Sequence, residues 1–387
     1  MGLFGDRRPT GSGLRGPAAD LIELRAKDDS ISTALWFKEE HLDEPVLHDG
    51  VEAVLPFLEM PMTGGVCELV HWDAREGVFV YATGEAWSVA ELAVVLKDLD
   101  ELMSTRAVGE LLLHTTKLLA DASEAGDSHG VLSHGALTPW RLFLSLEGKP
   151  RLVGHGVLQP EFSRFHADDT YLPSSRSLRY APPERFERKP EDVRSDVFSL
   201  GLIALELLVG EPAYLGNAEE VLDQAQVGAT AEVLDEVGAD LPDMLVDVLA
   251  GMLHPDPAER MLPEEVLDAL AEGVDGLAGE SLGELMGRMA GEARIADVEL
   301  PPEEEEEADA LPEEGGTAGD EPAAEAEVPD EELEQAARDA ESALANCERE
   351  VEDARALWED LPADLREEDG EEWTALLDEI KGLIGEG

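Results

Sequence analysis

Six residues near the amino terminus have the spacing of a phosphate-binding loop. Residues 11–16 read G-S-G-L-R-G, a formal GxGxxG sequence. Such a loop binds phosphate through backbone N–H groups, which a preceding strand holds toward the ligand. No strand-like run precedes residue 11, and residues 1–18 are rich in glycine and polar residues. We therefore predict that residues 1–18 are a flexible linker rather than a phosphate site.

A second set of chemical groups flanks a predicted hairpin in the middle of the chain. Its strands are expected at residues 142–146 and 151–153, joined by a turn that reads E-G-K-P. Residues 134–144 lead into the first strand and read H-G-A-L-T-P-W-R-L-F-L. Residues 152–156, at the end of the second strand, read L-V-G-H-G. The functional prediction depends on the residues at these two ends of the hairpin.

The two segments resemble the catalytic loop and the metal-binding motif of Ser/Thr protein kinases. In that family the first reads H-R/G-D-L-K-P-x-N and the second places D-F-G after apolar residues. Further on, residues 179–184 resemble the A-P-E motif, residues 194–201 resemble S-D-V-x-S-L-G, and residues 252–260 resemble D-P-x-x-R. Five motifs in the family's order, spanning about residues 65–272, make a specific signal.

The resemblance also implies structural roles for four residues inside these motifs. Glu184 and Arg260 are expected to form an ion pair, and Asp196 is expected to brace the loop around His134. Ordinary surface charge is the alternative for the three charged residues. Their positions inside matching motifs favour the structural roles.

Four departures from the family's pattern fall on catalytic positions. Phosphoryl transfer needs a carboxylate that orients the attacking hydroxyl and oxygen ligands that hold Mg²⁺ against the phosphates. Ala136 stands at the position of the base, and Gly154 and Arg141 stand at the positions of the two metal ligands. Thr138 replaces the lysine beside the transferred phosphate. The resemblance therefore implies a catalytically inactive member of the family, a pseudokinase.

The front part of the chain matches the family less well. By resemblance, Lys38 is the strand lysine that contacts phosphates and Glu52 is its helix partner, which makes these two the candidate nucleotide-binding residues. Residues 21–38 leave little room for two strands with a glycine-rich loop. A solvated strand lysine at position 38 therefore remains open as an alternative.

The pattern of elements predicts an α+β fold with two lobes. Strand-like runs at residues 20–24, 33–38, 66–72 and 78–81 predict a reduced sheet with one short helix, in a front lobe at residues 19–84. Ser88 with Glu91 forms a capping box that begins a helical lobe at residues 85–275. Strands followed by helices are typical of the α+β class.

The last hundred residues change in character. Residues 291–329 are rich in proline and glutamate, and we predict an acidic disordered linker there. Apolar residues at steps of three and four then return in residues 330–387, which predicts a helical hairpin or coiled coil. Its two segments either cover each other or bind a partner, and self-association through them is a further prediction.

Composition limits the partners and the compartment. The formal net charge is −61, from 89 acidic and 28 basic side chains, which repels phosphate backbones and anionic membranes. We therefore expect neither a nucleic-acid nor a membrane partner. The two cysteines, Cys67 and Cys347, match no disulfide framework or zinc spacing, and no secretory signal or membrane span is evident. These features predict a cytoplasmic protein without a metal site.

The leading hypothesis is a kinase-like scaffold or regulator in signalling, whose partner is a protein such as an active kinase or another signalling protein. It needs no cofactor. The alternative is a divergent Ser/Thr kinase or nucleotide-binding transferase that uses ATP without Mg²⁺, with Arg141 neutralising the phosphate charge. A third possibility is that the acidic arm acts alone, as a mimic of an acidic surface.

Overall fold

A computed structural model describes residues 3–58, 65–157, 159–168 and 170–295. The strands are β1 (Arg8–Leu14), β2 (Ala19–Arg25), β3 (Ile31–Phe37), β4 (Leu69–Asp73), β5 (Val78–Tyr81), β6 (Ala86–Ser88), β7 (Leu142–Ser145) and β8 (Pro150–Leu152). The helices are α1 (Pro45–Leu58), α2 (Val89–Asp98), α3 (Thr105–Gly126), α4 (Pro160–Ala167), α5 (Ser175–Leu178), α6 (Pro183–Phe186), α7 (Val193–Val209), α8 (Ala218–Val227), α9 (Ala231–Val237), α10 (Asp243–Met252), α11 (Pro263–Ala271) and α12 (Leu282–Met289). Short 3-10 turns are η1 (Glu39–His41), η2 (Asp127–His129), η3 (Gly238–Asp240) and η4 (Val274–Gly276).

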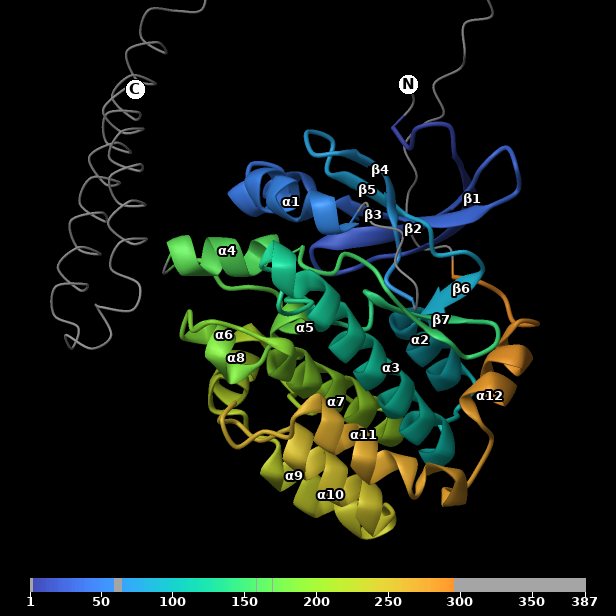
Figure 1. The fold of residues 1–387 in the computed structure, drawn as a ribbon, viewed down its shortest axis with the longest axis vertical. Coiled ribbons are helices and arrows are strands. Elements are labelled where there is room, and N and C mark those ends of the chain that lie inside the picture. The colour runs from blue at the N-terminus through green and yellow to red at the C-terminus, as the bar shows by residue number, and fades with distance from the viewer. Residues whose placement is uncertain (1–2, 59–64, 158, 169, 296–387) are drawn as a thin grey trace, which may run out of the picture. The chain divides into compact units, whose positions relative to one another are not determined.

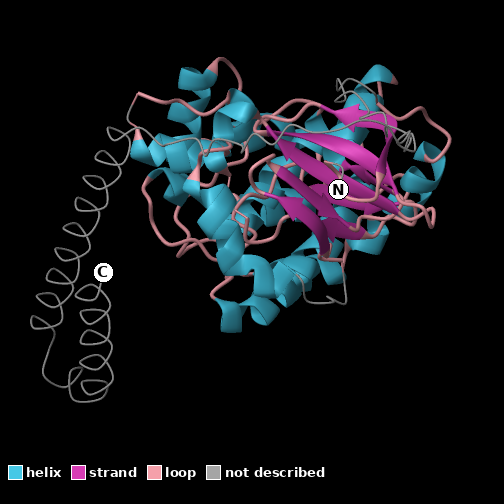
Figure 2. Ribbon diagram, turned by 90° about the horizontal axis from the view of Figure 1, so that it is seen from above, coloured by secondary structure: helices cyan, strands magenta, loops and turns pink. Residues whose placement is uncertain are grey.

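These elements form the expected α+β fold with a sheet-rich lobe and a helical lobe (Figure 1). The first lobe has a five-stranded antiparallel sheet in the order β1-β2-β3-β5-β4, together with α1. Figure 2 shows these strands gathered in one part of the molecule, with most helices beside them. A smaller sheet in the order β6-β7-β8 carries the predicted hairpin.

The prediction that residues 1–18 are flexible is wrong. Residues 8–14 form β1, which pairs with β2 from Arg8 opposite Arg25 to Leu14 opposite Leu21. Phe4 is buried on the outer face of the sheet, where its ring meets Trp36 edge to face at 6.4 Å. The glycines in residues 8–14 hide the alternation of apolar and polar side chains that usually indicates a strand. Strands pair through backbone N–H and C=O groups, so β1 forms without that alternation. The sheet is therefore not reduced.

Local signals account for the main helices of the second lobe. The hydroxyl of Ser88 accepts a hydrogen bond from the Glu91 amide at 3.1 Å and begins α2 where it was predicted. The predicted capping box is incomplete, because the Glu91 carboxylate binds Arg294 instead. Helix α7 is buried along almost its whole length and ends at Gly210, whose φ of 84° suits glycine. Helix α3 packs against α7 and α11, and this arrangement supports the hairpin of β7 and β8.

Most of the predicted acidic linker and the whole predicted helical hairpin at residues 330–387 lie outside the described residues. Residues 291–295 are the exception, and their contacts are given below. No helix in the described ranges combines the length and the apolar character that crossing a membrane requires.

Candidate functional site

Helix α7 fixes the loop that contains His134. The carboxylate of the buried Asp196 accepts hydrogen bonds from the backbone amides of His134 at 2.6 Å and Gly135 at 3.2 Å. Burial raises the pKa of Asp196 to about 7, against the lowering effect of these two amides and of Arg185. Asp196 thus braces the loop in the way that the resemblance implied.

The hairpin of β7 and β8 then brings together the positions that depart from the family. The Val153 amide donates to the Arg141 carbonyl at 3.0 Å, which places Gly154 beside Arg141. A Cβ atom added to Gly154 would lie 3.4 Å from Nη1 of Arg141, 3.4 Å from the hydroxyl of Tyr81 and 3.8 Å from Leu35. Ala136 and Thr138 are also buried. The expected metal site is therefore surrounded by a guanidinium, a phenol and an alkyl side chain.

Arg141 is a buried cation held by carbonyl groups. Its Nη1 donates to the carbonyl of Val157 and, at 3.5 Å, to that of Gly154. Burial lowers the pKa of Arg141 to about 10. Among the described residues no carboxylate forms an ion pair with this guanidinium. A fixed positive charge at this point disfavours a divalent cation.

The predicted pair of Lys38 and Glu52 is not formed. Lys38 follows β3, and its ammonium group donates to the Pro17 carbonyl at 2.5 Å, while Glu52 is exposed on α1. Three residues earlier, Leu35 projects from the middle of β3 toward Gly154. The residue of β3 that faces the site is thus a leucine, because register rather than the nearest lysine decides which side chain points inward.

The glycine-rich residues 11–16 lie in β1 and in its turn to β2, so the prediction of a linker there is corrected. The sequence did not reveal that residues 8–14 have an antiparallel partner strand, β2, which begins at residue 19. Below this hairpin is a space of about 20 Å³, bordered by Gly13, Thr33, Phe143 and Arg294. A space of this size holds about one water molecule, whereas sites for small ligands span roughly 300–1,000 Å³.

Arg294, near the end of the described chain, borders this space. No role was predicted for this residue from the sequence. Its guanidinium forms ion pairs with Glu91 at 2.7 Å and with Glu23 at 2.9 Å. The same group lies 4.9 Å from the ring centre of Trp87. Residue 294 is 203 positions from Glu91 and 271 from Glu23, and no local sequence pattern reports contacts over such separations.

Two buried histidines lie behind the site. The rings of His134 and His155 meet edge to face with centres 5.4 Å apart, and Phe57 of α1 lies 5.3 Å from His155. Among the described residues, the ring nitrogens of His155 have no hydrogen-bond partner, whereas the Val153 backbone interacts with the ring of His134. Burial lowers the pKa of His155 to about 4 and that of His134 well below its usual value. Both rings are therefore neutral at pH 7 and act as packing groups.

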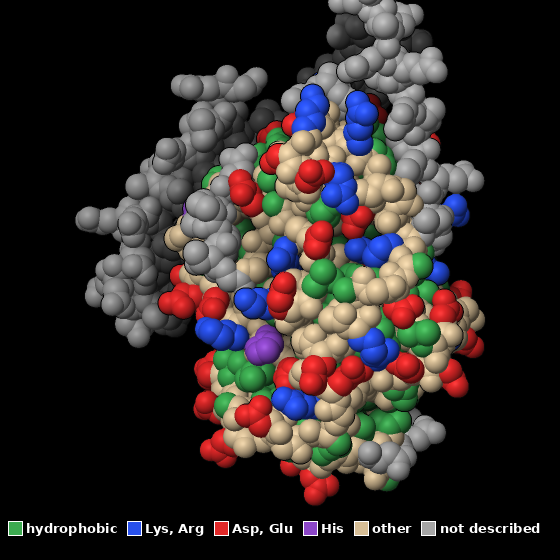
Figure 3. Space-filling view, turned by 90° about the vertical axis from the view of Figure 1, so that its right-hand side faces the viewer, with side chains coloured by type: hydrophobic (Ala, Val, Ile, Leu, Met, Phe, Trp, Pro, Cys, Tyr) green, Lys and Arg blue, Asp and Glu red, His purple; other side chains and the backbone are tan. Residues whose placement is uncertain are grey.

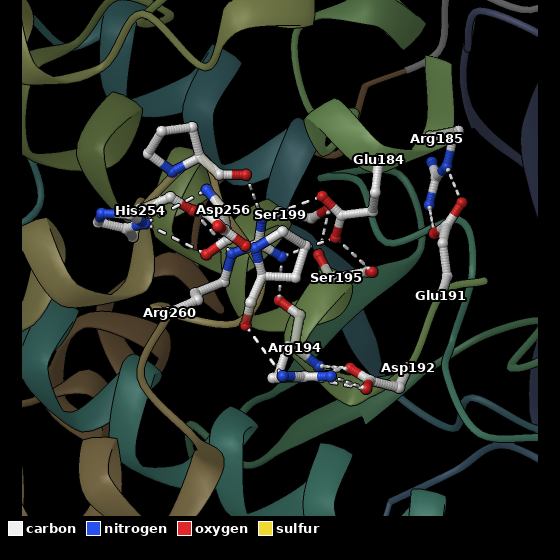
Figure 4. A network of polar contacts seen from close by, with 12 residues as sticks. Glu184, Arg185, Glu191, Asp192, Arg194, Ser195, Ser199, His254, Asp256 and Arg260 are labelled. Carbon is white, nitrogen blue, oxygen red and sulfur yellow. Dashed lines mark hydrogen bonds and ion pairs between the residues drawn. The ribbon is translucent and has the colours of Figure 1, made fainter. Parts of the chain in front are cut away.

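The second predicted contact joins α6 to the segment before α11 (Figure 4). Arg260 donates to both carboxylate oxygens of Glu184, at 2.7 and 3.0 Å, and both side chains are buried. Burial would raise the pKa of Glu184, but the hydrogen bonds and charge of Arg260 outweigh it and lower the pKa. Ser195 of α7 donates to the same carboxylate at 2.6 Å. The structure thus contains the ion pair that the resemblance implied.

Within the described residues, no three His, Cys, Asp or Glu side chains are grouped in a way that would hold a metal ion. Cys67 is buried, and burial raises the pKa of its thiol to about 12. At pH 7 this thiol is therefore protonated and unsuited to bind metal.

Comparisons with known proteins agree with the motifs. The family model for the protein kinase domain matches residues 162–270. Serine/threonine-protein kinase PknB of Mycobacterium leprae (strain TN) is 27% identical over 158 residues, which are 36% of this chain and 24% of that protein. Aurora kinase of Patiria pectinifera is 29% identical over 142 residues, which are 35% of this chain and 31% of that protein. The matches thus span less than a third of each of these two relatives.

Among solved structures, the kinase domain of Mycobacterium tuberculosis PknI has 15% sequence identity and a TM-score of 0.48, covering 70% of this chain and 97% of that one. With the family match, the motifs and the two-lobed α+β fold, the chain carries a protein-kinase-like domain. A shared fold does not by itself establish a shared activity.

Proposed function

We propose that this kinase-like chain is catalytically inactive and works by binding a protein, as a scaffold or regulator in signalling. The proposal rests on one observation above all. The position of the metal-binding aspartate is Gly154, and the groups closest to it are Arg141, Tyr81 and Leu35.

These groups do not fit Mg²⁺ or the phosphates that it carries. Magnesium requires oxygen ligands at near-octahedral positions, which usually come from carboxylates, phosphates and water. Near Gly154 the protein offers a guanidinium, the hydroxyl of the buried Tyr81 and an alkyl side chain. Burial also raises the pKa of Tyr81, so this hydroxyl remains protonated. The site therefore supports no phosphoryl transfer of the usual kind.

The base is missing as well. Ala136 lies in the loop braced by Asp196, so the loop is folded but carries no carboxylate at this position. Loss of a positioned general base costs about 10²- to 10⁴-fold in rate. Together with the missing metal ligands, this loss favours a binding role over transfer.

The alternative is a divergent kinase or transferase in which Arg141 neutralises the phosphate directly. Its guanidinium already donates to two backbone carbonyls, and binding of phosphate would break these hydrogen bonds. The 20 Å³ space under β1 must also open before a nucleotide can enter. Both requirements disfavour the alternative.

The first experiment is a thermal unfolding scan of the full chain with ATP or ADP at about 5 mM, each in the presence of Mg²⁺ and in the presence of a chelator. The second is a radiolabelled phosphoryl-transfer assay. An active Ser/Thr kinase is the positive control. We expect no rise in midpoint and no transfer. A rise that survives the chelator would support the nucleotide-binding alternative, and transfer above the protein-free background would overturn the proposal.

For the partner we propose a protein, with an active kinase or another signalling protein as the expected class. Self-association through residues 330–387 is a separate proposal. Sedimentation of the full chain, with Leu344→Asp as the variant, tests it. A concentration-dependent mass that the substitution abolishes is expected, and a monomer at all concentrations would contradict it.

A further inference from the structure

A groove of about 770 Å³ lies on the helical lobe beside α2 and α7. Its apolar part includes Val94, which is 41% exposed, and Leu102, which is 58% exposed. Trp140 and Tyr180 line its other side, with ring centres 6.3 Å apart. Exposed apolar side chains at the rim of a groove of this volume are typical of a docking surface.

The groove also contains arginines around Trp140. The guanidinium of Arg176 lies 6.0 Å from the ring centre of Trp140, and both side chains donate to the Arg15 carbonyl, at 3.4 and 3.3 Å. Nε of Arg179 is buried and has no hydrogen-bond partner among the residues that the structure describes. No ion pair joins Arg176 or Arg179 to any carboxylate in the described part of the chain. Guanidinium groups near an aromatic floor favour an acidic, partly apolar ligand.

Four acidic residues also line the groove, Asp100, Glu101, Glu206 and Glu211, and two of them have partners. Glu206 accepts from the Tyr180 hydroxyl at 2.5 Å, and Glu101 pairs with Arg288 at 2.9 Å. Acidic and basic side chains are interspersed on the face shown in Figure 3, with many of the acidic ones along its lower edge. Arg176 and Arg179 form no ion pair within the described residues, although the charge of Arg179 acts on Glu206, and both can attract further carboxylates.

The last described residues of the chain lie at this groove. Ile295, the last described residue, is one of its lining residues. Its carbonyl accepts from the Gly13 amide at 2.8 Å, and its amide donates to Glu91 at 3.1 Å. The ion pairs of the neighbouring Arg294 with Glu23 and Glu91 fix this part of the chain in the same place. The described part of the chain therefore ends in the lining of the groove.

The next twelve residues contain apolar and acidic side chains that suit the apolar part and the arginines of the groove. Residues 296–307 read A-D-V-E-L-P-P-E-E-E-E-E. Val298 and Leu300 are two positions apart and share a face in an extended chain, which Pro301 and Pro302 favour. Five glutamates follow. Twelve extended residues reach roughly 40 Å, whereas a helix the length of α7 spans roughly 25 Å, so reach is not limiting.

We propose that residues 296–307 occupy this groove in the same molecule. Val298 and Leu300 pack against the apolar part and the glutamates pair with Arg176 and Arg179. The proposal holds whether or not the domain transfers phosphate.

The test uses the full chain and a variant in which Glu303, Glu304, Glu305, Glu306 and Glu307 are all changed to Gln. A dye-labelled peptide of residues 296–307 is the probe, and fluorescence anisotropy measures its binding. Without a competing acidic segment, the variant should bind the peptide at least tenfold more tightly than the natural chain does. Equal affinities for both chains, or no binding to the variant, would overturn the proposal.

Substitutions in the groove locate the site. On the variant chain, Arg176→Ala with Arg179→Ala should weaken peptide binding at least tenfold. The matched control is Arg25→Ala with Arg75→Ala, two exposed arginines of the sheet-rich lobe, which should leave binding unchanged. Equal losses from both pairs would mean non-specific charge attraction and contradict the assigned groove. Circular dichroism of each variant checks that it is folded.

Hydrogen exchange distinguishes the source of the occupant. In the natural chain, residues 89–98 and 175–180 should be more protected than in the glutamine variant, to the same degree at low and high protein concentration. Protection that grows with concentration would identify a second copy as the occupant and overturn an intramolecular one. Protection that is equal in both chains would also contradict the proposal.

Discussion

Arg260 holds both carboxylate oxygens of Glu184 in the interior of the helical lobe, with Nη1 2.7 Å from Oε1 and Nη2 3.0 Å from Oε2. A buried, bidentate ion pair thus joins two residues that are 76 positions apart in the chain. Such a pair contributes little compared with apolar packing, but removal of one partner leaves an uncompensated buried charge.

Replacing either partner of this pair should therefore be costly. We expect Glu184→Ala or Arg260→Ala to lower the free energy of unfolding by about 3–5 kcal/mol, measured by urea denaturation. The matched control is Asp121→Ala, which breaks the exposed pair with Lys117 at 3.0 Å and should cost about 0.5 kcal/mol or less. Similar costs at the two places would show that burial does not decide the effect.

The support of the loop by Asp196 leads to a second prediction. Asp196→Ala removes both acceptors from the amides of His134 and Gly135, and we expect a loss of about 2–4 kcal/mol in unfolding free energy. Asp196→Asn keeps one acceptor oxygen and should lose about half as much. Urea denaturation of the two variants checks the order, and an asparagine variant at least as unstable as the alanine variant would contradict it.

A third prediction concerns pH. Burial lowers the pKa of His155 to about 4 in the folded chain, against an ordinary value of 6.5. The unfolded chain therefore binds the proton more readily, so this contribution to stability is complete above pH 6.5 and is lost as the pH falls toward 4. One group changes the unfolding free energy by at most about 1.4 kcal/mol per pH unit.

His155→Phe removes this contribution and keeps a ring in contact with Phe57 and His134. Between pH 6.5 and 5 the variant should lose about 2 kcal/mol less stability than the natural chain. Unfolding by urea at both pH values provides the comparison. Parallel losses in the two proteins would mean that His155 does not carry the effect.

The contact between Ile295 and β1 gives a fourth prediction. Arg294→Ala removes the ion pairs with Glu91 and Glu23 that position Ile295, whose carbonyl accepts from the Gly13 amide. We expect hydrogen exchange in residues 8–14 to become about tenfold faster, since lost contacts favour local opening. Arg288→Ala is the control, because Arg288 pairs with Glu101 and Glu280 outside this contact. Equal acceleration in both variants would contradict the prediction.

Much of the fold followed from local signals in the sequence. The cap at Ser88, the hairpin of β7 and β8 and the strands at β4 and β5 depend on residues within a few positions of one another. The motif resemblance likewise implied the Glu184–Arg260 pair and the role of Asp196, because each residue lies inside a short recognisable segment.

The site itself depended on information that no short segment holds. Lys38 was the nearest lysine to the expected position, but the register of β3, in which Leu35 pairs with Leu21 and Phe79, turns Leu35 toward Gly154. Strand β1 was not predicted, because its glycine-rich sequence has no alternating side-chain pattern. It pairs with β2 through backbone groups.

The sequence by itself determined the two-lobed kinase-like fold, and its resemblance to the family implied that Ala136, Arg141 and Gly154 stand at the positions of the residues of phosphoryl transfer. Only the tertiary structure decided what fills their surroundings and that Arg294 closes the space below β1. The reason is physical: side-chain identity is written along the chain, whereas burial, register and contacts between residues 203 or 271 positions apart exist only once the chain has folded.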